Sequence, residues 1–100
     1  MKTSKTIGLC RSRRTYTLGR TRDASPSEQA LGLALKLHEE VAEVTRAPTD
    51  VCEYADVLQA LMDYATFNGV RWASVTEARV KKAAKDGTFI PSRIWEAKKP

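Results

Sequence analysis

The residues best suited to chemistry in this chain are acidic, and the first group lies in the stretch KLHEEVAEV, residues 36–44. In a helix, at about 100° per residue, the side chains of Glu39, Glu40 and Glu43 fall within one arc roughly 100° wide. Like charges at helical spacings of three and four cost a few tenths of a kcal/mol each. The pattern therefore indicates either a solvated acidic face or a site where a positive group is bound.

A second acidic pair, Glu53 and Asp56, follows in CEYADVLQAL. Residues three apart on a helix lie about 60° apart, and a short loop makes consecutive helices antiparallel neighbours. Glu40 and Glu43 can then face Glu53 and Asp56 across a helix pair. Hard carboxylate oxygens on rigid helices suit Mg²⁺, with Mn²⁺ as a substitute. Zinc is not expected, because His38 is the only histidine and no thiolate stands at ligand spacing.

Each acid also has an ordinary structural interpretation. Glu53 fits a capping box opened by Asp50, Glu40 fits an ion pair with Lys36 one turn away, and Glu39 fits a water-facing position. For any single acid the structural interpretation is the commoner one. The two spaced pairs together, on adjacent helices, favour a metal site.

Three helices are expected to position these acids. Ser25 and Glu28 form a predicted capping box, with Pro26 at the first helical position. The helices are expected at about 26–45, 50–67 and 73–85, with Gly69 and Gly87 at the stops after the second and third. The stretches TYTLGR (15–20) and TFIPSRIW (88–95) are expected to be extended.

The expected fold is all-α, an antiparallel helical bundle completed by oligomerisation, with short extended N- and C-terminal segments. The chain has 100 residues, and one of that size buries only about 60–65% of its unfolded surface, so a second copy is a natural source of further core. The second helix offers a core stripe formed by Val51, Tyr54, Ala55, Leu58, Leu61, Met62 and Ala65.

Charge divides the chain into a basic arm, residues 1–24, and a helical domain, residues 25–100. The arm has seven Lys or Arg against one Asp, whereas the domain has ten against eleven Asp or Glu. No apolar run approaches the roughly 20 residues that span a membrane. The two cysteines have no metal-type spacing, so a reduced cytoplasmic setting is expected, with Cys52 buried and Cys10 a free thiol.

Three motifs resemble one enzyme family. The segments KLHEEVAE, EYADVLQAL and KKAAKDGTFIPSRI are similar to the MazG-like nucleotide pyrophosphohydrolases of the all-α NTP pyrophosphatase superfamily. The resemblance covers about residues 31–94. It implies a homodimer or homotetramer, and Mg²⁺-dependent hydrolysis of a nucleoside triphosphate to the monophosphate and pyrophosphate.

The resemblance also implies roles for individual residues. Glu40, with Glu39 as an additional ligand or the residue that orients water, would be catalytic. The implied metal ligands are Glu40, Glu43, Glu53 and Asp56, and the implied phosphate-binding residues are Lys82, Lys85 and Arg93. Cys52, Gln59 and Asp86 depart from the family pattern, which leaves the substrate open.

Two other functions compete with this one. The basic arm could bind nucleic acid through phosphate contacts, or the chain could be a non-catalytic helical regulatory protein. Among enzymes, a phosphoribosyl-ATP pyrophosphatase would use the same acids.

Overall fold

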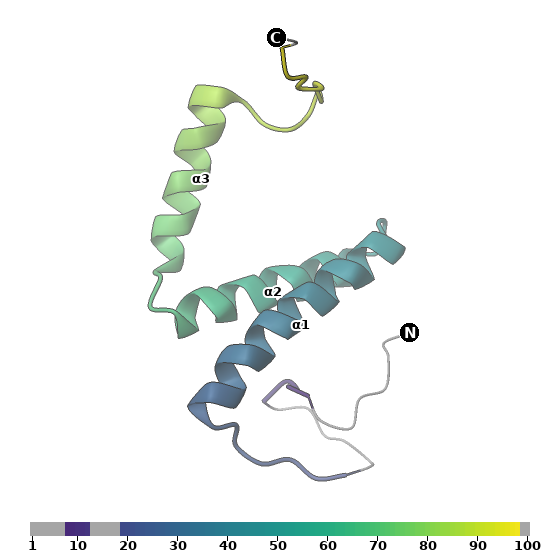
Figure 1. Cartoon of the computed structure of the whole chain (residues 1–100), viewed down its shortest axis with the longest axis vertical. Helices are drawn as coiled ribbons and strands as arrows, with labels where there is room; N and C mark the ends of the chain where they lie inside the picture. Colours follow the sequence, from purple (N-terminus) through teal and green to yellow (C-terminus); the bar gives the residue numbers. More distant parts are fainter. Residues whose placement is uncertain (1–7, 13–18, 99–100) are drawn as a thin grey trace. The chain divides into compact units, whose positions relative to one another are not determined.

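The computed structural model describes residues 8–12 and 19–98, and it contains three helices and no strand among them (Figure 1). The helices are α1 (Pro26–Arg46), α2 (Val51–Phe67) and α3 (Trp72–Asp86). The predicted all-α class is confirmed, and each boundary lies within one residue of the expected position. Most of the N-terminal stretch expected to be extended, residues 15–18, lies outside the described residues.

The start of α1 is fixed by the predicted capping box. The backbone N–H of Glu28 donates to Oγ of Ser25 at 3.2 Å, and the Glu28 carboxylate accepts from the Ser25 N–H at 3.0 Å. Arg22 adds two parallel hydrogen bonds to the same carboxylate, at 2.8 and 2.7 Å. The Arg22 hydrogen bonds, followed by that from the Ser25 backbone, lower the pKa of Glu28 from 4.5 to about 2. The arm is thus joined to the helix at residue 22.

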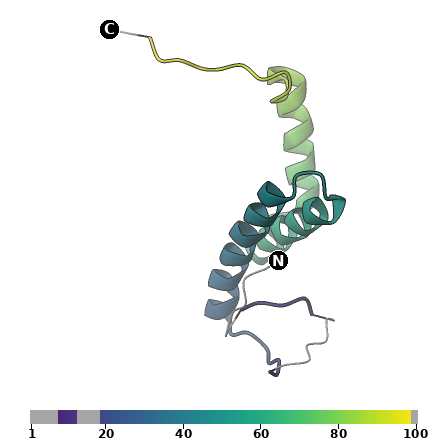
Figure 2. The same ribbon diagram turned by 90° about the vertical axis from the view of Figure 1, so that its right-hand side faces the viewer.

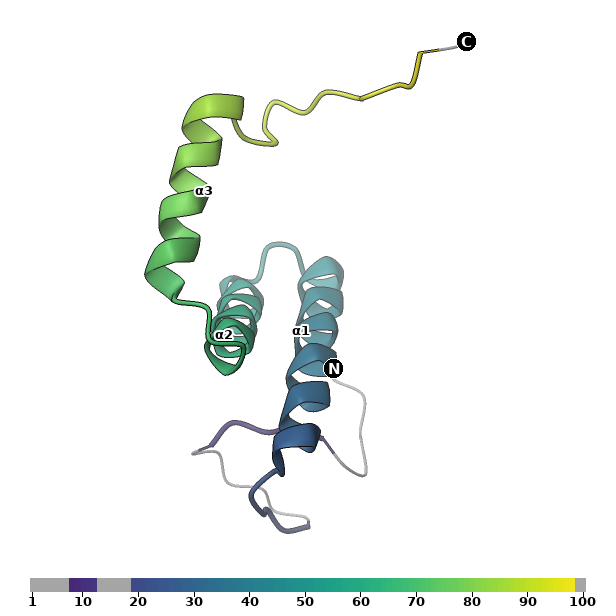
Figure 3. The same cartoon turned by 60° about the vertical axis from the view of Figure 1, so that its left-hand side comes forward.

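Helices α1 and α2 pack side by side as an antiparallel hairpin, joined by residues 47–50 (Figures 1 and 3). Asp50 caps α2 by accepting from the N–H of Cys52 at 2.9 Å. The Tyr54 hydroxyl donates to the carbonyl of Pro48 at 2.8 Å and so ties the first turn of α2 to the connection. The short connection therefore makes α1 and α2 antiparallel neighbours, as the sequence predicts.

The side of α2 that faces α1 is the acidic one, as predicted for Glu53 and Asp56. Ala60 is the single buried apolar residue in the described part of the chain. The expected stripe stays exposed at Val51, Tyr54, Leu58 and Leu61, which are 80%, 56%, 51% and 40% accessible. Within the single chain this stripe does not form the core, because the acidic face, which contains the small residue Ala60, is turned toward α1. Burial of the stripe by a second copy stays a prediction.

Cys52 is likewise exposed, not buried as expected, and both thiols are free. Its place in the first turn of α2, beside the cap, explains the exposure. None of the described helices is long and apolar enough to cross a membrane.

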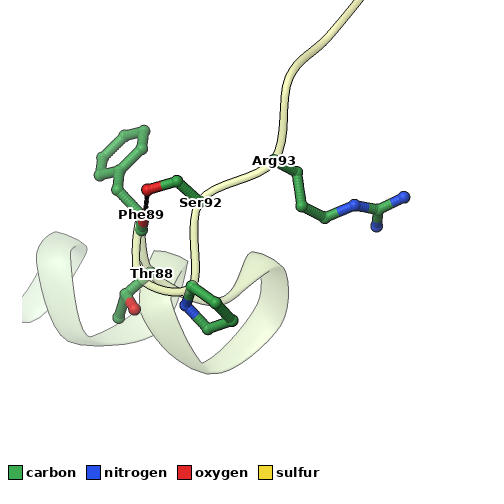
Figure 4. Close-up of a pocket in the computed structure, with 5 residues that line it drawn as sticks. Thr88, Phe89, Ser92 and Arg93 are labelled. Atoms are coloured by element: carbon green, nitrogen blue, oxygen red, sulfur yellow. Dashed lines mark hydrogen bonds between the residues drawn. The ribbon is translucent and has the colours of Figure 1, made fainter.

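Residues 71–100 form a separate compact unit that contains α3. Helix α3 stops at Gly87, whose φ of +81° suits a residue without Cβ. Beyond it the chain turns at residues 88–93, where Oγ of Ser92 donates to the Phe89 carbonyl at 2.6 Å (Figure 4). Phe89 is 94% exposed.

Candidate metal centre

Three of the predicted ligands come together between α1 and α2. One carboxylate oxygen each from Glu40, Glu53 and Asp56 lies within 4.8 Å of the other two. Glu40 comes from the C-terminal half of α1, and the other two lie one turn apart at the start of α2. The hairpin that brings α1 beside α2 (Figure 2) therefore assembles the cluster from both helices.

Burial distinguishes this cluster from an ordinary acidic surface. Glu40 is 3% exposed and Glu43 7%, and these are the only buried charged residues among those described. Glutamate is almost never fully buried unless its charge is compensated. The most buried positions of this helix pair are therefore occupied by two glutamates and one alanine, so most of them carry a charged group.

Glu43 lies outside the cluster of three. Its Oε1 accepts from Nη2 of Arg46 at 3.1 Å, and its side chain is 9% exposed. Glu39 is held in a similar way by Nζ of Lys36, at 3.3 Å. The structure thus brings together three of the four predicted ligands and places the fourth in an ion pair on the same helix.

The contact between an arginine of the N-terminal arm and the cluster was not predicted from the sequence. Nη2 of Arg11, in the N-terminal arm, lies 2.6 Å from Oδ1 of Asp56. The side chain of Asp56 is 28% exposed and that of Arg11 59%. The basic composition of the arm was visible in the sequence, but no spacing rule connects residue 11 with residue 56.

The arm is seated near this contact by Leu9. A Cβ placed on Gly32 of α1 would lie 2.6 Å from Cγ of Leu9, closer than real Cβ contacts. Leu9 therefore lies directly on the backbone of α1 at the one position in the helix without a side chain. Two contacts, one apolar and one ionic, hold residues 8–12 against the hairpin.

The predicted phosphate-binding residues belong to the second unit. Lys82 and Lys85 are exposed on α3, and Arg93 is exposed after the turn (Figure 4). Their approach to a substrate held at the acidic cluster stays a prediction.

No protein-family model, no curated protein and no solved structure matches this chain. The similarity to MazG-like enzymes therefore rests on the motif residues alone.

Proposed function

We propose that the chain binds Mg²⁺ at Glu40, Glu53 and Asp56 and hydrolyses nucleoside triphosphates to nucleoside monophosphates and pyrophosphate. The observation that carries the proposal is the convergence of three carboxylates within 4.8 Å, one of them 3% exposed. Because water screens such a group poorly, carboxylates this close need positive charge beside them, and a divalent cation would supply it.

The residues present fit a hard divalent cation. All three donors are carboxylate oxygens on regular helices, and the described part of the chain places no histidine or thiolate in the cluster. Three protein ligands leave coordination positions for water and phosphate oxygens, as Mg²⁺ prefers. When bound, Mg²⁺ would neutralise phosphate charge and acidify a coordinated water.

The remaining residues would position and neutralise the substrate. Glu39 is one residue before Glu40, with a side chain 16% exposed and held by Lys36, so it could accept a proton from the attacking water. Lys82, Lys85 and Arg93 would stabilise the charge on the leaving pyrophosphate. Glu43 is proposed as an additional ligand that leaves Arg46 when the cation binds.

Assembly with at least a second copy belongs to the same proposal. With Ala60 as its single buried apolar residue, the described part of the chain has too little core for a stable domain of this size. Exposed apolar side chains follow both helices of the hairpin, at Leu31, Leu35, Leu58 and Leu61. Joining two such faces in a homodimer or homotetramer would provide the missing core.

The competing nucleic-acid function is less well supported. Arg11 and Arg22, two arginines of the arm, form ion pairs with Asp56 and Glu28 of the same chain. Phosphate contacts by these side chains would have to replace those pairs. A purely regulatory role offers no reason to bury Glu40 and Glu43.

The test is pyrophosphate release from a panel of ribo- and deoxynucleoside triphosphates and phosphoribosyl-ATP, with and without Mg²⁺. Glu53→Gln and Asp56→Asn should each abolish release, because each removes one ligand charge with little change in shape. The matched control is Glu77→Gln, which removes an exposed carboxylate paired with Lys81 on α3. This variant should retain full activity.

Release that needs Mg²⁺ and is lost in both cluster variants but not in the control would support the proposal and rank the substrates. Cleavage of phosphoribosyl-ATP and of no other nucleotide would identify the protein as a phosphoribosyl-ATP pyrophosphatase. Mg²⁺ binding without release from any nucleotide would contradict the proposed reaction.

A further inference from the structure

The arm places a positive group of the chain itself at the acidic cluster. The Arg11 guanidinium lies 2.6 Å from Oδ1 of Asp56, and Asp56 is one of the three residues whose oxygens converge. An arginine in direct contact with a carboxylate occupies part of the space and satisfies part of the charge that a divalent cation would take.

We propose that Arg11 is a built-in competitor for the cation site, so that Mg²⁺ binding and seating of the arm on the hairpin oppose each other. The inference rests on the proposed cation site but not on the proposed reaction. Oδ1 of Asp56 cannot bind Mg²⁺ and accept a hydrogen bond from Arg11 without weakening one of the two interactions. A guanidinium beside Mg²⁺ also adds electrostatic repulsion between the two positive charges. By linkage, whatever weakens the Arg11 contact strengthens Mg²⁺ binding, and Mg²⁺ weakens the contact by the same factor.

Gly32 provides a second way to change the same contact, at a residue outside the acidic cluster. Leu9 lies on the Gly32 backbone so closely that a Cβ there would meet Cγ of Leu9 at 2.6 Å. Gly32→Ala would therefore displace Leu9 and, two residues further on, loosen Arg11. The substitution also suits the helix, because alanine is more favourable than glycine in a helix interior.

The size of the effect follows from the exposure of the pair. Exposed ion pairs contribute about 0.2–1 kcal/mol, and Arg11 is 59% exposed. Removing the competitor should therefore tighten Mg²⁺ binding by up to about fivefold. Gly32→Ala, which weakens the contact without removing the charge, should have a smaller effect in the same direction.

The experiment is titration of the full chain with Mg²⁺ alone by isothermal titration calorimetry, with circular dichroism to confirm the fold of each variant. Arg11→Gln and Gly32→Ala are compared with the wild type. The control is Arg20→Gln, which removes the same charge from the arm at a residue that forms no ion pair within the described part of the chain. Arg11→Gln should bind Mg²⁺ more tightly than both the wild type and Arg20→Gln.

Equal or weaker Mg²⁺ binding by Arg11→Gln would overturn the inference, as would an equal gain in Arg20→Gln, which would reflect general charge alone. Absence of Mg²⁺ binding in every variant would overturn it together with the proposed function. Tighter binding by Arg11→Gln with no hydrolysis of any nucleotide would support the inference and reject the proposed reaction, so the two failures are distinguishable.

Discussion

Nη2 of Arg46 lies 3.1 Å from Oε1 of Glu43, so one of the two buried glutamates of α1 is held by a cation three residues along the same helix. Glu43 is 7% exposed as a residue and Glu40 is 3% exposed. The two acids thus share a helix face but have different surroundings. Glu40 belongs to the cluster with Glu53 and Asp56, whereas Glu43 is placed beside it with a counter-ion from its own helix.

Arg46→Gln should destabilise the metal-free chain by about 1 kcal/mol, because it deprives a buried carboxylate of a charged hydrogen-bond donor. If Glu43 becomes a ligand when Mg²⁺ binds, the loss should shrink when Mg²⁺ is present. Urea unfolding of both proteins, in EDTA and in Mg²⁺, measures the two differences. Lys81→Gln, which breaks the exposed pair with Glu77, should cost less than about 0.5 kcal/mol in both conditions. The same loss for Arg46→Gln with and without Mg²⁺ would mean that Glu43 is not a ligand.

Mg²⁺ should raise the melting temperature of the wild type. At about ten times its dissociation constant, a ligand that binds only the folded state stabilises it by about 1.4 kcal/mol, or roughly 6–10 °C for a domain of this size. Glu53→Gln should lose most of this gain, and Glu77→Gln should keep it. Thermal melts followed by circular dichroism at several Mg²⁺ concentrations provide the measurement. An equal rise in wild type and Glu53→Gln would place the cation elsewhere.

The Arg22–Glu28 pair predicts a pH dependence of stability in the acid range. The hydrogen bonds from Arg22 and then from the Ser25 backbone lower the pKa of Glu28 from 4.5 to about 2. Between these values the unfolded chain binds more protons at this group than the folded chain does, so the contribution to stability rises with pH. It is fully present above about pH 4.5 and is lost as the pH falls through about 2.

The stability difference between the wild type and Glu28→Gln should therefore be largest above pH 4.5 and should vanish toward pH 2. Urea unfolding at a series of pH values measures it. Arg22→Gln removes the largest cause of the shift and should flatten the same dependence. A difference that is constant across the acid range would show that the carboxylate is not stabilised in the folded state.

The exposed apolar stripe predicts a loss of assembly on charge insertion. Leu58 is 51% exposed in the single chain, so Leu58→Glu should be tolerated by the hairpin itself but not by an apolar interface. Light scattering after size exclusion should show a smaller assembly than the wild type, with a lower melting temperature. Thr66→Glu, at an exposed polar position of the same helix, serves as the control. A wild type of single-chain mass would contradict the proposed assembly.

The helix boundaries follow closely from the sequence because their signals are local. Ser25, Pro26 and Glu28 specify the start of α1 through atoms within one turn, and Gly69 and Gly87 both take the positive φ that the predicted stops require. The convergence of Glu40, Glu53 and Asp56 was also accessible, since it needs only helical spacing and a short connection.

What the sequence did not specify depends on contacts distant along the chain. The exposure of Leu58 and Leu61 in the single chain is one example, because periodicity shows that a face is apolar but not whether the same chain or another copy covers it. The seating of Leu9 on Gly32 and the pairing of Arg11 with Asp56 each join residues more than twenty positions apart. No pattern of residue types in the arm indicates either contact.

The two exposed, free thiols are native sites at which labels can be attached to measure the distance between the arm and α2. Cys10 immediately precedes Arg11 in the arm, and Cys52 lies one helical turn before Asp56 on α2, so each partner of the Arg11–Asp56 contact has a thiol close to it in the sequence. Spin labels attached to the native cysteines would report the separation of arm and hairpin by electron paramagnetic resonance, without any engineered site. Movement of the arm can therefore be observed in the wild-type sequence as Mg²⁺ is added.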